Sequence, residues 1–327
     1  MSDRHGTIRN ISIMVILGTF LTFGGLYAAD QFIWVLIFAV LVRFFTTSLL
    51  PFTDLWTLNY SESSGKEFGN YRLWGSIGLV ILTLLLGMAA TLGELSAVFG
   101  VHWGILILCL ALVISMKEQG RAPVHAAKLW KGLKLFCKPK MLLFSAAVLL
   151  INIPARAFDG FFSIYLKQMG GSGMMIAVIA VIAPLCEIPF FIYGSRWTRS
   201  NGIYPILMVA AGLYSVIWLI YVWNESVLLL AVSQIMFGGA HVLFYVAAMI
   251  YMRIHVPSYL QSTGQLFLFM LVGTLSGAVG NLWAGHLLLD GDGARLFGFS
   301  AVGTLVAFLV FLFMHVHQRT QNESLRE

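Results

Sequence analysis

The sequence predicts an all-α integral membrane protein of about ten transmembrane helices arranged in two bundles. Of its 327 residues, 59% are hydrophobic and only 10% are charged, which is far from the composition of soluble globular domains. Apolar runs of about 17 to 25 residues, long enough to cross a bilayer as helices, recur along the whole chain. The net charge of +6 arises in the short segments between these runs. A bilayer accounts for this charge better than nucleic acid does.

The predicted spans fall into two groups on either side of the longest polar segment, residues 117–140. Four spans form an N-terminal bundle (1–116), six form a C-terminal bundle (141–316), and residues 317–327 form a tail. The spans are roughly 11–29, 33–58, 72–91, 97–116, 141–166, 174–195, 203–223, 227–252, 262–288 and 296–316.

The basic residues predict the orientation of the chain. Sixteen of the twenty Lys and Arg residues lie near the termini or in and beside the segments 59–71, 117–140, 196–202 and 253–261. The positive-inside rule places these segments and both termini in the cytoplasm, in a multi-pass protein of the cell (inner) membrane. Within 117–140, Lys128, Lys131 and Lys134 are interleaved with apolar residues. This segment is either an amphipathic helix on the inner leaflet or a solvated basic linker.

Ionisable residues inside the spans are the main candidates for function, because a charge at mid-bilayer costs a few kcal/mol or more. They are Arg43, Asp54, Arg156, Asp159, Glu187 and His241. Glu187 lies between Pro184 and Pro189 with no basic residue within a helical turn, so we expect it to hold a proton much of the time. It is either the group that takes up and releases protons or a neutral packing residue.

The other charged candidates each have two interpretations. Arg156 and Asp159 share one helix face, so they either neutralise each other or line a cavity; nearby Asn152 and Pro154 favour a polar, interrupted helix there. His241 follows Gly238 and Gly239 in an apolar helix. It is either a buried histidine with one satisfied neighbour or a contact for substrate or proton.

Asp54 and Arg72 flank the polar hairpin between the second and third spans, 18 residues apart. They either pair with each other or hold a polar substrate, the guanidinium donating hydrogen bonds and the carboxylate accepting them. Trp56, Tyr71 and Trp74 lie nearby and suit a ring-bearing solute.

Two further patterns favour packing rather than chemistry. Gly273, Gly277, Asn281 and Gly285 recur every fourth residue in the ninth span, which is typical of a close helix contact; Asn281 would hydrogen-bond across that contact or touch a ligand. Cys109, Cys137 and Cys186 have no metal-type spacing. We therefore expect no metal, cofactor or disulfide framework.

The residues FGNYRLWGSIG (68–78) resemble the start of the fifth helix in the oligosaccharide/nucleoside:proton symporter branch of the major facilitator superfamily, which includes lactose permease and phenylpropionate permeases. Gly194-Ser195-Arg196, PSYLQSTGQ (257–265) and GNLWAGHLL (280–288) resemble later segments of that branch, and the resemblance covers essentially the whole chain.

The resemblance implies a monomeric secondary transporter that carries a sugar, nucleoside or phenylpropionate-like acid together with protons, with no catalytic residues and no nucleic-acid partner. Asp54 and Arg72 stand where that branch binds its substrate, and Glu187 resembles an acid found in relatives. Together with the residues singled out above, this predicts a substrate site of Asp54, Arg72, Trp74, Arg156, Asp159 and His241, with Glu187 as the proton-coupling residue. No acid follows His241, so the His-Glu pair of lactose permease is not carried over.

The resemblance also implies an N-terminally truncated major facilitator fold. The first bundle matches helices 3–6 of the family, and residues 2–7 resemble the loop after its second helix. We therefore expect the first two helices to be missing, through a misassigned start or a true truncation.

Two alternatives from other classes stay open. One is a non-transporting membrane remnant or assembly partner. The other is an intramembrane serine protease, because Gly170-Gly171-Ser172-Gly173 fits a G-x-S-G pattern and His241 or His286 could serve as the base.

Overall fold

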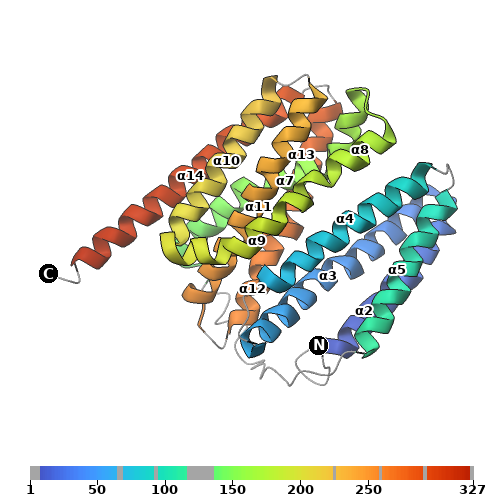
Figure 1. Ribbon diagram of the computed structural model, residues 1–327, viewed down its shortest axis with the longest axis horizontal. Helices are drawn as coiled ribbons and strands as arrows, with labels where there is room; N and C mark the ends of the chain where they lie inside the picture. The colour runs from blue at the N-terminus through green and yellow to red at the C-terminus, as the bar shows by residue number, and fades with distance from the viewer. Residues whose placement is uncertain are drawn as a thin grey trace. The chain divides into compact units, whose positions relative to one another are not determined.

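A computed structural model describes residues 8–64, 69–91, 95–115, 136–223, 226–257, 260–289 and 293–324, and every regular element in these ranges is helical (Figure 1). Each predicted span corresponds to one helix or to a run of consecutive helices. Within the described residues, nine helices or helix runs are long and apolar enough to cross a membrane, and Phe32–Thr47 is a shorter apolar stretch. The predicted all-α membrane class is therefore confirmed.

The chain divides into two compact units. The first comprises Met1–Phe68 and Leu85–Lys128, and the second comprises Gly69–Leu84 and Leu129–Glu327. The structure thus groups most of the third predicted span with the C-terminal helices, whereas the sequence assigned that span to the N-terminal bundle. The predicted linker residues Lys128, Lys131 and Lys134 lie outside the described residues.

The first unit contains α2 (Ile8–Tyr27), α3 (Phe32–Ser64), α5 (Leu95–Ser115) and the end of α4 (Gly69–Thr91). Glycines of α2 let α3 approach closely, because a Cβ at Gly18 would collide with the Phe45 ring. Aromatic side chains pack α2 against α5: the ring centroids of Phe23 and Phe99 are 4.8 Å apart.

The second unit contains the start of α4 and all later helices. They are α7 (Pro139–Gln168), α8 (Gly173–Ala180), α9 (Ile182–Asn201), α10 (Ile203–Trp223), α11 (Val227–His255), α12 (Gln261–Phe269), the π-helix η3 (Met270–Leu275), α13 (Ser276–Leu289) and α14 (Gly293–Ser324). Its core is aromatic: the Trp218 and Phe297 rings stack at 6.1 Å, and Phe158 packs edge-on against Trp218 at 5.6 Å. These contacts join α7, α10 and α14.

Several helices extend beyond their predicted ends. The predicted polar segment 59–71 is helical up to Ser64 and again from Gly69, and α14 continues through most of the predicted tail to Ser324. A helix satisfies its backbone hydrogen bonds internally, so it can continue past the bilayer where the apolar signal stops. The end of α9 is marked instead by Gly202, whose φ of 91° favours glycine.

Interruptions within the spans also differ from the prediction. The span 174–195 is divided into α8 and α9 at Val181, because Pro184 has no N–H to donate to the Ala180 carbonyl. By contrast, α7 continues through Pro154, where an interruption was predicted. The ninth span contains the π-helical turn η3, after which the Ser276 hydroxyl donates to the Leu271 carbonyl at 2.6 Å.

Close packing of α9 on α11 depends on Gly238. A Cβ at this position would overlap the Ala183 carbonyl oxygen of the neighbouring helix backbone. We expect Gly238→Ala to destabilise the protein by about 1–3 kcal/mol, as overpacking does, and to lower the midpoint of thermal unfolding in detergent. Gly298→Ala is the control: nothing lies within 4 Å of its added Cβ, so helix propensity should leave that variant as stable or more stable. Equal midpoints for the two variants would contradict the packing.

Candidate functional site

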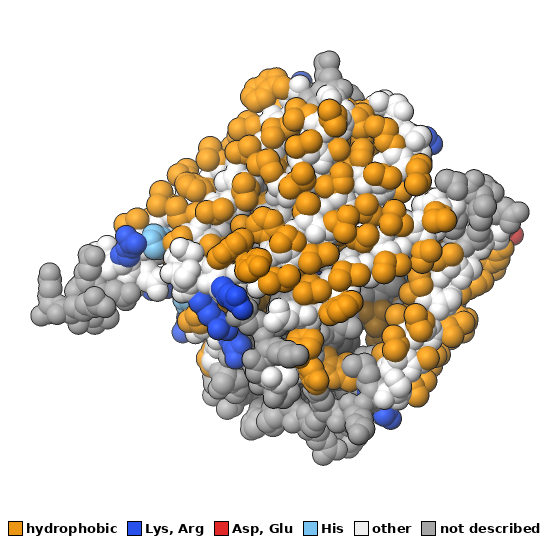
Figure 2. All heavy atoms as spheres, in the orientation of Figure 1, with side chains coloured by type: hydrophobic (Ala, Val, Ile, Leu, Met, Phe, Trp, Pro, Cys, Tyr) orange, Lys and Arg blue, Asp and Glu red, His pale blue; other side chains and the backbone are white. Residues whose placement is uncertain are grey.

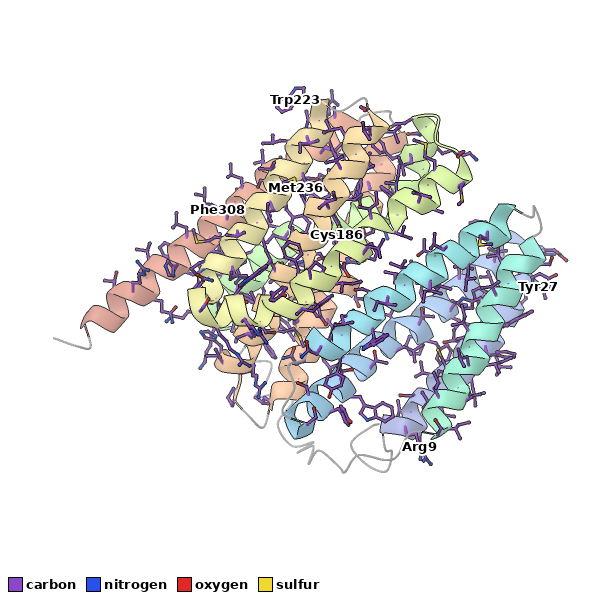
Figure 3. The ribbon with its side chains drawn as sticks, viewed as in Figure 1. Arg9, Tyr27, Cys186, Trp223, Met236 and Phe308 are labelled. Carbon is purple, nitrogen blue, oxygen red and sulfur yellow. The ribbon has the colours of Figure 1, made fainter. Side chains whose placement is uncertain are left out.

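Polar side chains from α4, α9 and α11 meet inside the second unit. The Ser76 hydroxyl donates to the Glu187 carboxyl at 2.6 Å, and Ser76 is only 2% exposed. This is a short, strong O–H···O hydrogen bond. Figure 3 labels Cys186 on α9, the residue directly before Glu187 in the chain.

Arg72 lies one helical turn before Ser76, so the two side chains share a face of α4. Its guanidinium carbon lies 5.6 Å from the centre of the Phe191 ring on α9 and 6.0 Å from that of Tyr245 on α11. Both are cation–π distances. Because Glu187 and Phe191 are also one turn apart, the two contacts align α4 antiparallel to α9.

His241 joins the same group through Tyr245. The two rings are nearly parallel, with centroids 6.2 Å apart and an interplanar angle of 15°. Tyr245 therefore lies in contact with both His241 and Arg72. We name Arg72, Ser76, Glu187, His241 and Tyr245 the polar cluster.

The predicted pair Arg156 and Asp159 forms an ion pair on α7, with Arg156 Nη1 3.0 Å from Asp159 Oδ2. Both side chains stay partly open, 30% and 43% exposed respectively. The Nε of Arg156 is buried and makes no hydrogen bond within the described part of the chain. Both charges act on Glu187, so the ion pair borders the polar cluster while keeping one donor unused.

Two of the predicted site residues stay untested. Asp54 is buried, with 3% of its surface exposed, and belongs to the first unit, whereas Arg72 belongs to the second. Their pairing stays a prediction. Trp74 is 67% exposed on α4, so its proposed contact with a solute also stays a prediction.

Sequence reasoning missed Ser76 and Tyr245. Ser76 carried a weak signal, since it lies one turn after Arg72 within the FGNYRLWGSIG motif. Tyr245 similarly lies one turn after His241. Serine and tyrosine are common one turn from other residues in membrane helices. Only the residues that surround Ser76 and Tyr245 in the structure show that these two belong to the polar cluster.

The helix contact predicted from the small-residue stripe in the ninth span is partly correct. The Asn281 side chain lies directly beside Gly160 of α7, which places it at a helix contact. The closest backbone approach, however, is made by Gly280, against Ile153 and Ala157, while nothing lies within 4 Å of a Cβ added at Gly273 or Gly277. The contact face of α13 is therefore rotated from the predicted stripe, downstream of the π-helical turn.

Ser172, the proposed protease nucleophile, has a structural role. It is the N-cap of α8, and its hydroxyl accepts a hydrogen bond from the Met175 N–H at 3.2 Å. Serine is common at this position because its hydroxyl accepts a hydrogen bond from a backbone N–H of the first turn that would otherwise be unpaired.

Comparison with known proteins decides the family. The model of the "MFS_1 like family" matches residues 1–315. The chain belongs to this family. It is 26% identical over 305 residues to a maltose permease of Geobacillus stearothermophilus (92% of this chain, 77% of the relative). It is 23% identical over 254 residues to a probable 3-phenylpropionic acid transporter of Escherichia coli K12 (77% of this chain, 66% of the relative).

The fold agrees with that family. The crystal structure of a mutant form of the nucleoside transporter NupG superimposes with a TM-score of 0.77 at 15% identity, covering 96% of this chain and 85% of that one. The predicted membership of the major facilitator superfamily is confirmed, and this family member is an integral membrane protein. The chain spans about two thirds to three quarters of the length of the curated relatives that it matches.

Proposed function

We propose that this major facilitator protein is a secondary transporter that binds a small polar or aromatic organic solute at the polar cluster. The observation that carries the proposal is the hydrogen bond from Ser76 to Glu187. It places a carboxyl group and its hydroxyl partner inside helices of membrane-spanning length, where polar groups are costly and usually functional. A solute hydroxyl can replace Ser76 on that carboxyl.

The chemistry of the cluster supports a solute that combines a ring with hydroxyl or carboxylate groups. Arg72 offers a planar fork of donors suited to a carboxylate or to vicinal hydroxyls. Phe191 and Tyr245 offer aromatic faces beside it. Sugars and phenylpropionate-like acids, which the names of the two relatives indicate as their substrates, both meet this description.

We assign the coupling proton to Glu187. Its carboxyl already accepts a hydrogen bond, and the charges of Arg72, Arg156 and Asp159 act on it. Movement of a solute or of a neighbouring charge changes the cost of holding Glu187 ionised, which links protonation to solute binding. Alternating access then carries solute and proton together, in a monomer with both termini on the cytoplasmic side of the inner membrane.

The proposal is tested by uptake in proteoliposomes. The purified chain is reconstituted and supplied with radiolabelled maltose, 3-phenylpropionate or uridine, with and without an inward proton gradient. We expect at least one solute to accumulate above its level in protein-free vesicles, and the gradient to increase accumulation. Folded protein that transports none of the three classes would contradict the proposed substrate range.

A further inference from the structure

A second polar site lies at one end of the second unit, where α7 and α10 begin and α11 and α14 end. A cavity of about 200 Å³ opens there. Its polar lining comes from Lys140, Tyr204, His255, His317 and Gln318. The polar cluster shares none of these residues, so this cavity is a separate feature.

The basic lining is held in place by neighbouring groups. The His255 ring stacks on Tyr251 at 4.0 Å, and its Nδ1 lies 3.0 Å from the Tyr251 carbonyl oxygen. The His317 ring is parallel to that of Phe313 within 6°. Lys140, which carries a positive charge, lines the same small volume as these two imidazole rings.

The start of α7 adds to this positive character. Lys138 is its N-cap and makes no side-chain capping bond, and Pro139, the next residue, lines the cavity with Lys140. The positive end of the helix dipole therefore faces the cavity, together with N–H groups that have no capping side chain.

The rest of the lining is apolar, from Leu143, Phe313 and Met314. The predicted span of α14 ends at residue 316, so His317 and Gln318 follow the point where the apolar stretch stops. Figure 2 shows the same change on α14, whose hydrophobic surface gives way to Arg and His side chains near its end. A positively charged recess beside an apolar wall at the edge of a membrane span matches a phospholipid headgroup and the start of its acyl chain.

We propose that this cavity binds the phosphate headgroup of an anionic phospholipid. Lys140, His317 and the start of α7 contact the phosphate, Gln318 and Tyr204 donate hydrogen bonds, and Leu143 and Phe313 contact the acyl chain. This binding does not depend on the identity of the transported solute.

The test titrates the detergent-purified full chain with phosphatidylglycerol or phosphatidylcholine and measures bound lipid by native mass spectrometry. We expect phosphatidylglycerol to bind at least fivefold more tightly. Lys140→Gln should weaken phosphatidylglycerol binding about fivefold, the effect of one basic residue near an anionic headgroup. His317→Gln, at an exposed position on α14, should weaken it in the same direction. Arg199→Gln is the matched control, because Arg199 is exposed in the last turn of α9 and does not line the cavity.

Three results would overturn the proposal. Equal losses in Lys140→Gln and Arg199→Gln would mean that general surface charge attracts the lipid. Equal binding of phosphatidylcholine would remove the role of the anionic headgroup. Displacement of phosphatidylglycerol by inorganic phosphate at the same concentration would identify a site for free phosphate instead. Thermal unfolding without lipid verifies that each variant is folded.

Discussion

Glu187→Gln is expected to abolish accumulation driven by a proton gradient while leaving exchange of solute across the membrane largely intact. A glutamine at this position still offers an oxygen to the Ser76 hydroxyl, which now bonds Glu187 at 2.6 Å. It cannot gain or lose a proton, so solute binding is uncoupled from the gradient. The measurement compares gradient-driven uptake with counterflow in the same proteoliposomes, and we expect uptake to fall more than about tenfold, since the coupled step is lost.

Asp30→Asn serves as the control for Glu187→Gln. Asp30 is an exposed acid between α2 and α3, so its neutralisation should leave both activities unchanged. Wild-type accumulation by Glu187→Gln would show that another group carries the proton.

Arg72→Lys is expected to weaken solute binding strongly even though it keeps the positive charge. Lysine lacks the planar fork of donors and cannot lie flat over the Phe191 and Tyr245 rings, which are 5.6 and 6.0 Å from the guanidinium carbon. Losing one charge-assisted hydrogen bond to the solute costs about 1.5–3 kcal/mol, so the apparent KM for uptake should rise by roughly tenfold or more.

Arg319→Lys provides the matched control, because Arg319 is an exposed arginine near the end of α14, outside the polar cluster. Its KM should stay at the wild-type value. If both arginine variants had the same KM, Arg72 would have no particular role in binding.

Much of the fold could be predicted because it follows from local chemistry. Long apolar runs require helices in a bilayer, and this alone located the apolar part of each predicted span. The ends were less predictable, as α3 and α14 show: beyond the bilayer a helix continues or stops according to its own propensity and capping, and hydropathy no longer reports on it. The division at Val181 follows from Pro184, whereas the same type of residue at Pro154 leaves α7 continuous.

The candidate site was predicted only in part for a different reason. The cost of burying charge drew attention to Glu187 and His241, and the polar hairpin drew attention to Arg72. The structure brings these three residues together. Which neutral residues complete the group depends on how each helix is rotated about its axis. Ser76 and Glu187 are 111 residues apart, and no local pattern in a single sequence reports that contact. The rotation of α13, which brings Gly280 rather than Gly277 against α7, has the same origin.

Binding of a solute between Arg72 and Glu187 would be visible in a crystal structure determined with a transported solute. We expect solute oxygens within about 3 Å of the Glu187 carboxyl and the Arg72 guanidinium, with Ser76 no longer hydrogen-bonded to Glu187. A solute resolved away from both side chains, with the Ser76–Glu187 hydrogen bond intact, would rule out this binding site.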